Sequence, residues 1–501
     1  MNLNHINVIA RYEVKLVKRS WLFRIFAILA LLFISAIMLG YQTGIVNRMD
    51  NLWPRIAVSS LMPFCNTYFY NIAQSVIVVF LAGSFLKRDK KLDTAEVIYV
   101  RPMSNADYIV GKTWGIVKVF ITLNIITLLF TAFLNILINK SPFDLFPYLF
   151  YLLTISVPSL LFVLGLSFTA MCILKNQAVT FIVMLGIIGT VFFYLTDTLY
   201  GVFDFFGVNI PAIFSDVTGH ADLRLFLLQR FSYLLAGIGL ISMTIALVKR
   251  LPHKPWKIAV VYTFSSLFLL AACLGGLLYI LHYNHQLDLR HQYIMTFDKY
   301  ADVPHVDLLV NDISVTPQGY RLAGKSTVKV ANNNAKPLDK IIFYLNPELT
   351  VTSVEMAGKN LLFRRDHQVI EVDQPIQQQE ELTLTINYEG KISENICYTD
   401  VLTEDYLDTK VPQVFWRFGK RYAWLSNTFT LLTPECIWYP VTIAPVNPGA
   451  PYNVRKNFTD YTLTVHYEGD KTVLSQGKSK FGHHLYEYLR FARNQSNHRR
   501  L

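Results

Sequence analysis

Seven long apolar runs occupy the first 281 residues and limit the possible folds more than any other feature of the chain. A helix needs about 20 predominantly apolar residues to cross a hydrocarbon core roughly 30 Å thick. The runs that meet this requirement are 21–41, 66–86, 114–138, 147–174, 177–196, 225–248 and 257–281. The fifth continues apolar through Asp197 and Asp204, where an interfacial or re-entrant piece could follow. We therefore predict an α-helical transmembrane bundle of about seven spans over residues 21–281.

The composition divides the chain into two parts. Over the whole chain 52% of the residues are hydrophobic and 16% are charged, whereas soluble domains are about 25% charged. Residues 1–281 contain 22 Lys and Arg against 11 Asp and Glu, and residues 282–501 contain 24 of each kind. The excess positive charge stands in short clusters between apolar runs, which favours a membrane protein and argues against a nucleic-acid partner.

The distribution of Lys and Arg among the loops predicts an orientation, because positively charged loops stay in the cytoplasm. Fifteen of these residues lie in the N-terminal segment and the loops after the even-numbered spans, and four lie in the alternate loops. We therefore place the N-terminus in the cytoplasm and the residues after the seventh span outside, in a plasma (bacterial inner) membrane. The first run exceeds the roughly 7 to 15 residues of a signal-peptide core, so we interpret it as an uncleaved span.

The first 20 residues are predicted to form a basic amphipathic helix on the cytoplasmic membrane surface. Residues 4–19 place apolar side chains broadly on one side of a helix and Arg11, Lys15, Lys18 and Arg19 mostly on the other. The alternative is a basic segment that only sets the topology.

The connection from Lys87 to Trp114 is the longest on the cytoplasmic side and carries charges of both signs. It contains an acidic residue, a Thr-x-Glu step, an Arg-Pro pair and a Tyr-x-x-Gly-Lys ending. The residues, in order, are Asp89, Thr94, Glu96, Arg101, Pro102, Tyr108, Gly111 and Lys112. Together with the basic helix and the spans, this pattern resembles the permease subunits of type-2 ABC exporters over about residues 1–250. The resemblance implies that the loop docks a separate ABC-type ATPase subunit and that permeases pair as a homo- or heterodimer; the alternative is a solvated loop.

Residues Ala106–Thr113 match a permissive form of the phosphate-binding P-loop pattern. A working P-loop needs a glycine-rich turn between a strand and a helix. Only Gly111 supplies such flexibility here, and the helix that follows enters the predicted membrane. We therefore expect neither a nucleotide site nor a cofactor in this chain. Asn124 is the most central polar residue of the spans, and without a chain of carboxylates a proton-driven transporter is disfavoured.

Strand-like patterns replace the apolar runs after a juxtamembrane linker at 282–302. Alternating and β-branched runs separated by turn residues are typical of antiparallel strands. The runs are 326–332, 340–346, 349–358, 359–373 and 381–390. We predict an all-β, antiparallel, sandwich-like extracytoplasmic domain over 303–478 and a basic tail over 479–501.

Further along, a Thr-Pro-Glu and Trp-Tyr-Pro step precedes a strand and a Ser-x-Gly ending. The residues concerned are Thr433, Pro434, Glu435, Trp438, Tyr439, Pro440, Tyr461 and Gly477. They resemble the N-terminal β domain of M1-family zinc aminopeptidases over about residues 305–478. The resemblance implies a domain that packs against a separate catalytic domain and holds no zinc ligand itself.

Catalytic and metal-binding residues are not expected in this sequence. A zinc peptidase uses two His one helical turn apart with a Glu between them, and none of the twelve His stands in an H-E-x-x-H pattern. His483, His484 and Glu487 have the wrong order. Cys397 and Cys436 could pair in an oxidising compartment or remain as buried thiols.

These observations favour the membrane-spanning permease subunit of an ABC-type (type-2) transport system, powered by a separate ATPase and carrying a non-catalytic outer domain. Two alternatives stay open. One is a truncated, membrane-anchored M1-family metallopeptidase that lacks its catalytic domain, and the other is a membrane binding protein without transport activity.

Overall fold

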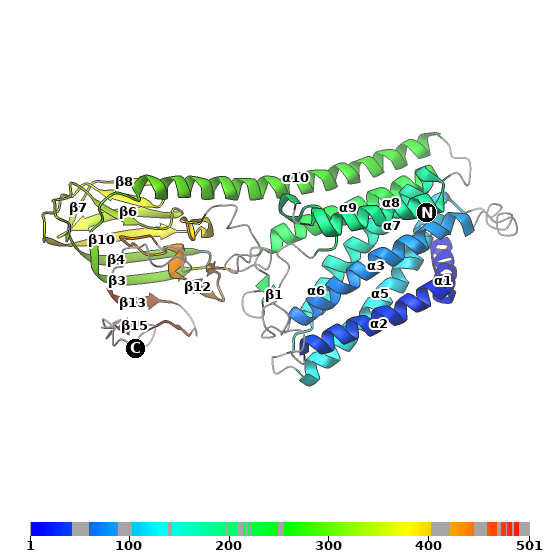
Figure 1. The fold of residues 1–501 in the computed structure, drawn as a ribbon, viewed down its shortest axis with the longest axis horizontal. Helices are drawn as coiled ribbons and strands as arrows, with labels where there is room; N and C mark the ends of the chain where they lie inside the picture. The colour runs from blue at the N-terminus through cyan, green and yellow to red at the C-terminus, as the bar shows by residue number, and fades with distance from the viewer. Residues whose placement is uncertain are drawn as a thin grey trace, which may run out of the picture. The chain divides into compact units, whose positions relative to one another are not determined.

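The computed structural model describes most of the chain and separates it into a helical unit, up to Tyr283, and a strand-rich unit, from Asn284 onward (Figure 1). The described residues are 2–42, 60–88, 103–138, 143–196, 198–207, 214–215, 219–220, 222–248, 255–401, 421–444, 458–467, 472–476, 478–482 and 485–489.

The helical unit contains all seven of the expected spans as helices long and apolar enough to cross a membrane. Its helices are α1 (Leu3–Arg19), α2 (Trp21–Gln42), α3 (Leu61–Arg88), α5 (Asn105–Ile138), α6 (Phe146–Tyr151), α7 (Val157–Leu174), α8 (Gln177–Thr190), α9 (Leu223–Leu247) and the part of α10 (Pro255–Tyr300) up to Tyr283. A π-helical turn at Leu152–Ser156 joins α6 to α7, so these two form one span, and a second π-helical turn at Val191–Leu195 prolongs α8. Seven helices of this length and composition are compatible with the predicted multi-pass membrane protein.

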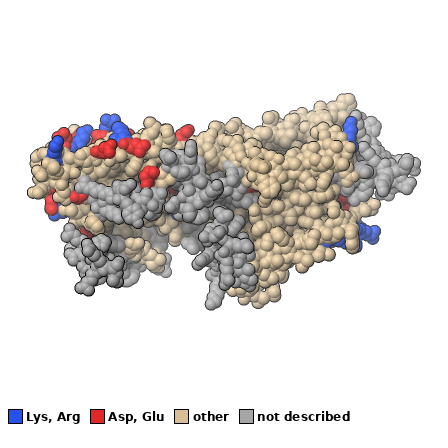
Figure 2. Space-filling view, viewed as in Figure 1, with Lys and Arg blue, Asp and Glu red and all other residues tan. Residues whose placement is uncertain are grey.

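The outside of the helical unit is apolar. Leu129 on α5, Ile182 on α8 and Leu270 on α10 are 63%, 69% and 66% exposed. In Figure 2, charged side chains gather over the strand-rich unit, and few of them lie on the visible face of the helical unit. Contiguous exposed apolar surface of this kind is unfavourable in water and suits contact with lipid.

The apolar continuation of the fifth run folds back against the helices. After a single 3₁₀ turn at Thr198–Gly201, the backbone around Asp204 and Phe206 accepts hydrogen bonds from α3 and α9. A short strand pair, β1 (Phe214–Ser215) with β2 (Gly219–His220), precedes α9.

The strand-rich unit begins with the last part of α10, because this helix continues to Tyr300 through most of the expected linker. Its strands are β3 (Asp307–Gln318), β4 (Arg321–Ala331), β5 (Ile341–Tyr344), β6 (Leu349–Met356), β7 (Lys359–Asn360), β8 (Phe363–Asp366), β9 (Val369–Val372), β10 (Glu381–Gly390), β11 (Ala423–Leu425), β12 (Thr430–Leu432), β13 (Asp460–His466), β14 (Lys478–Gly482) and β15 (Leu485–Leu489).

Eight of these strands form one sheet in the order β14-β15-β13-β3-β4-β10-β6-β7. The pairing of β4 with β10 runs without a register shift from Ala331↔Glu381 to Leu322↔Gly390. The prediction of a purely antiparallel domain is wrong at one place, since β13 pairs parallel to β3. More than 140 residues separate β3 from β13, and a connection of this length can join two parallel strands, whereas a short hairpin turn joins only antiparallel ones.

A second sheet, in the order β5-β9-β8, shares a hydrophobic core with the first. The core contains Val328 and Leu384 from the large sheet and Phe343 and Ile370 from the small one. The single strand expected at 359–373 is wrong, because this segment holds β7, β8 and β9. His367, with φ 47°, reverses the chain between β8 and β9. Strand β3 was not among the expected strands.

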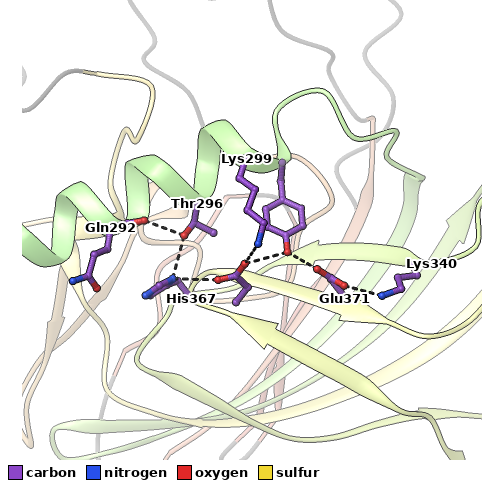
Figure 3. A network of polar contacts seen from close by, with 8 residues as sticks. Gln292, Thr296, Lys299, Lys340, His367 and Glu371 are labelled. Carbon is purple, nitrogen blue, oxygen red and sulfur yellow. Dashed lines mark hydrogen bonds and ion pairs between the residues drawn. The ribbon is translucent and has the colours of Figure 1, made fainter.

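Polar side chains connect the end of α10 to β8 and β9 (Figure 3). Lys299 Nζ lies 2.5 Å from Asp366 Oδ2, and the Tyr300 hydroxyl donates to both Asp366 and Glu371. Lys340 Nζ lies 2.9 Å from Glu371 Oε2. The bond from Lys299 holds the pKa of Asp366 below its ordinary value of 3.8, and the Tyr300 and Lys340 bonds hold that of Glu371 below 4.5.

This network predicts a loss of stability in acid. Both carboxyl groups have a lower pKa in the folded chain, so as the pH falls the unfolded chain binds protons before the folded chain does. The stabilisation by the network is therefore complete above about pH 4.5 and is lost as the pH falls below that value. We expect the thermal unfolding midpoint of the purified full chain to decrease when the pH is lowered from 6 to 3. The decrease is expected to be smaller in a variant that carries Asp366→Asn and Glu371→Gln. Asp312→Asn, on an exposed position of β3, is the control. An equal fall in all three proteins would contradict the prediction.

Candidate functional site

The first helix, α1, is fixed to the N-terminal part of α5. Asn2 caps α1 by accepting a hydrogen bond from the Asn4 amide, and its own amide donates to Asp107 Oδ1 at 2.8 Å. His5 Nδ1 lies 3.7 Å from the same carboxylate. Asp107 therefore connects the beginning of one helix with the beginning of the other.

Two glycines let the backbones of α1 and α5 approach closely. A Cβ atom on Gly111 would lie 2.8 Å from Ile9 Cβ, and one on Gly115 would lie 2.9 Å from the Ala10 carbonyl oxygen. Real Cβ atoms do not occupy such positions without displacing a neighbour, so both positions require glycine. Small residues are the usual means by which helices pack closely in membrane proteins.

An ion pair is buried beside this glycine contact. Lys112 Nζ lies 3.5 Å from Glu13 Oε2, and the two side chains are 4% and 2% exposed. The Lys112 ammonium also lies 5.1 Å from the centre of the Tyr108 ring. Breaking a buried pair leaves a charge without compensation, so a displacement of α1 along α5 that separates the two groups is expected to be costly.

The structure shows where part of the expected docking loop lies. Tyr108, Gly111 and Lys112 belong to α5, are buried, and contact α1 or each other. The remaining loop residues lie outside the described part of the chain: Asp89, Thr94, Glu96, Arg101 and Pro102. The three described residues therefore hold α1 in place and do not form an exposed surface.

A second cluster, which we call the polar core, lies inside the helical unit. Its members are buried polar residues on α3, on α5, around the π-helical turn before α7, on the segment after α8, and on α9. They are Asn66, Asn71, Gln74, Asn124, Thr127, Thr131, Ser156, Ser159, Asp204, Gln229 and Arg230.

Hydrogen bonds connect the helices of the polar core in pairs. Asn66 Nδ2 donates to Thr131 Oγ1 at 2.7 Å, which joins α3 to α5. Asn71 Nδ2 donates to Ser159 Oγ at 2.9 Å, which joins α3 to α7. Asn124 Nδ2 donates to Ser156 Oγ at 2.7 Å, which joins α5 to the π-helical turn. Side-chain hydrogen bonds of this kind hold helices together where lipid provides no hydrophobic driving force.

Arg230 on α9 is the charged centre of the polar core and is 1% exposed. Its guanidinium donates to the carbonyl oxygens of Asp204 and Phe205 at 3.1 and 3.2 Å and to Gln229 Oε1 at 2.8 Å. Position 207 requires glycine, because a Cβ atom there would lie 2.5 Å from Arg230 Nη1 and because Gly207 has a φ of 77°, in the left-handed region. The arrangement satisfies the carbonyl groups of a non-helical segment inside an apolar surrounding.

Sequence reasoning identified Asn124 on α5 but did not identify the members of the polar core on α3. The available signal was the spacing of Asn66, Asn71 and Gln74, which places them on one half of a helix surface. The same span has the lowest mean hydropathy of the seven, 1.3. Polar residues gathered on one side of a weakly apolar span point to a buried contact.

The aminopeptidase-like motif of the strand-rich unit occupies packing positions. The Trp438 and Tyr439 rings lie 4.6 Å apart and the Tyr439 and Tyr461 rings 5.7 Å apart, while the Pro440 carbonyl accepts a bond from Asn311 at 3.0 Å. Thr433, Pro434 and Glu435 enter a short 3₁₀ turn. Gly477 lies outside the described residues. Within the described ranges, no group of three or more His, Cys, Asp or Glu is placed to hold a metal.

No protein-family model matches the chain, and no curated protein matches it in sequence. Among solved structures, the M1 zinc metallopeptidase from Deinococcus radiodurans matches 37% of this chain and 38% of its own, with 18% identity and a TM-score of 0.26. Native leukotriene A4 hydrolase from Saccharomyces cerevisiae matches 37% of this chain and 27% of its own, with 10% identity and a TM-score of 0.23. The chain thus spans well under half the length of either enzyme.

We predict that Gly111→Ala weakens the contact between α1 and α5. The added methyl group meets Ile9 and the Ile6 carbonyl, and overpacking of this kind costs about 1–3 kcal/mol. Gly186→Ala on α8 is the matched control, because a Cβ atom there meets nothing within 4 Å. Thermal unfolding of the purified proteins in detergent measures the effect. Equal midpoints for the two variants would rule out a close helix contact at Gly111.

We also predict strong coupling between Glu13 and Lys112. Glu13→Gln or Lys112→Met alone leaves one buried charge and is expected to cost about 3 kcal/mol or more. The double variant removes both charges and is expected to recover a large part of that loss. Thermal unfolding of the four proteins gives the coupling as a double-mutant cycle. Additive effects of the two substitutions would show that the side chains do not interact.

Proposed function

We propose that this chain is the membrane-spanning permease subunit of an ABC-type (type-2) transport system and is driven by a separate ATPase. In this proposal it acts as a homo- or heterodimer in a plasma (bacterial inner) membrane, with the N-terminus in the cytoplasm and the strand-rich unit outside. The observation that carries the proposal is the buried contact between α1 and α5. It joins two features of the exporter resemblance that are distant in sequence: the basic amphipathic helix and the Tyr-x-x-Gly-Lys ending.

The proposed ATPase-docking surface is the part of the loop that precedes this contact. It contains Asp89, Thr94, Glu96, Arg101 and Pro102, and its mixed charges suit recognition of a polar partner surface. The α5 residues of the motif then act as positioning residues. They fix the end of the loop to α1, so that a displacement of the loop is transmitted to a span.

The polar core supports transmission from α5 to other spans. Asn66 and Thr131 connect α5 to α3, and Asn124 and Ser156 connect it to the turn before α7. A displacement of α5 has either to move these neighbours or to break hydrogen bonds in an apolar surrounding. We propose that this set of helices responds together to the ATPase.

For the strand-rich unit we propose a non-catalytic, sandwich-like extracytoplasmic domain similar to the N-terminal β domain of M1-family aminopeptidases. The residues of the motif support this role, because Trp438, Tyr439 and Tyr461 pack against one another in its core. In this proposal the chain itself is not an enzyme, and the chemistry of the system belongs to the ATPase.

The proposal predicts that an ATPase co-purifies with the chain. Tagged full-length protein, extracted from host membranes in mild detergent, is expected to retain an ABC-type ATPase that mass spectrometry identifies. Glu96→Lys combined with Arg101→Glu reverses two charges of the docking loop and is expected to lower ATPase recovery about tenfold or more. Arg48→Glu combined with Arg55→Glu reverses charges in a loop predicted to lie outside and is the control.

One result would contradict the permease proposal, and a second would contradict the proposed docking surface alone. One is the absence of any ATP-binding cassette protein from the wild-type preparation. The other is equal recovery of the ATPase with the docking-loop variant, the control variant and the wild type, which would place the ATPase contact elsewhere.

A further inference from the structure

We infer that Cys397 and Cys436 become joined by a disulfide bond that fixes the 3₁₀ turn at Glu394–Ile396 to the one at Pro434–Cys436. The two sulfur atoms lie 3.4 Å apart, and both residues are completely buried. A disulfide requires an S–S distance of about 2.05 Å, so the two atoms have to approach by about 1.4 Å, which side-chain rotation can supply. The inference rests on the proposed outside location of the strand-rich unit, since disulfides persist in oxidising compartments.

The backbone at Cys397 is held by Arg290 of α10. The Arg290 guanidinium is fully buried and donates to four carbonyl oxygens, those of Asn395, Cys397, Tyr398 and Val401, at 3.1, 2.7, 2.9 and 2.9 Å. Charge-assisted bonds of this kind are stronger than neutral ones. The four hydrogen bonds therefore hold the backbone conformation of the segment that carries Cys397.

The backbone at Cys436 is held by Asn346, which also binds the segment before Cys397. Asn346 Nδ2 donates to the Cys436 carbonyl at 2.7 Å and to the Ser393 carbonyl at 2.8 Å. Its Oδ1 accepts from the Ser393 amide at 3.0 Å. One buried amide group thus connects both cysteine-bearing segments, and the thiols face each other because their backbones are fixed from two sides.

The chemistry requires an oxidant, for which a thiol–disulfide oxidoreductase of the outer compartment is the appropriate class. The thiolate of one cysteine attacks the oxidant's disulfide and forms a mixed disulfide, and one oxidant thiol leaves. The second cysteine attacks that mixed disulfide and releases the other oxidant thiol. Two protein thiols are oxidised, one disulfide of the oxidant is reduced, and two protons pass to the two released thiols.

Burial determines when the reaction takes place. In the folded chain the hydrogen bond between the Cys436 and Cys397 thiols and burial raise the pKa of the Cys436 thiol, which leaves little reactive thiolate, and both residues are shielded from solvent. The bond is therefore expected to form before the two segments become enclosed. Once formed, the same enclosure protects it from reductants.

The test uses the full chain with Cys65, Cys172 and Cys273 replaced by Ala, so that the two inferred partners are the only cysteines. Cells are quenched in acid, and the protein is denatured and labelled with a maleimide that carries polyethylene glycol, which shifts the gel band once per free thiol. Without reductant no shift is expected, and after reduction two shifts are expected. Cys397→Ser and Cys436→Ser controls should each give one shift under both conditions.

Two shifts without reductant would overturn the inference. An alkaline phosphatase fused after Leu501, which is active only outside the cytoplasm, distinguishes the reasons. Active phosphatase together with free thiols overturns the disulfide alone, whereas inactive phosphatase together with free thiols overturns the proposed orientation as well. Active phosphatase with thiols labelled only after reduction supports both.

Discussion

The need to satisfy backbone hydrogen bonds without water governs the helical unit. Surfaces that suit lipid, such as those around Leu129, Ile182 and Leu270, leave no solvent to pair with an exposed amide or carbonyl group. Each span therefore has to be a helix, and side chains that carry hydrogen-bonding groups have to face inward. The arrangement of α3, α5 and α7 follows from this requirement, because polar residues of these helices and of the π-helical turn before α7 bind one another.

Burial imposes the same need on irregular backbone in both units, because a buried carbonyl group without a donor is costly, and in each unit an arginine supplies donors. In the helical unit Arg230 donates to the carbonyl groups of Asp204 and Phe205, and in the strand-rich unit Arg290 donates to four carbonyl groups between Asn395 and Val401. A planar guanidinium has five N–H donors, more than the two of a side-chain amide, and can therefore meet a larger number of carbonyl oxygens at once.

Hydropathy predicted all seven spans because a span is defined by composition over about 20 residues, a property of the local sequence. Strands β6 and β10 were predicted close to their observed bounds for the same reason, since their alternation is local. Two other features depend on residues more than 100 positions apart, and no local pattern encodes them. They are the parallel pairing of β13 with β3 and the hydrogen bonds from Arg290 to the segment that carries Cys397. The buried contact of Gly111 with Ile9 belongs to this second group, although each helix was predicted separately.

The buried positions of Gly111 and Lys112 give these two residues of the loop motif a role in packing α5 against α1. A sequence pattern that ends in Tyr-x-x-Gly-Lys suggests exposed, partner-binding residues, yet glycine is needed there for close approach and lysine for the ion pair with Glu13. Because a buried ion pair adds little net stability compared with apolar packing, its value lies in selecting one arrangement of α1 on α5. Such a contact restricts the motion of α1 along α5, because sliding would separate two buried charges.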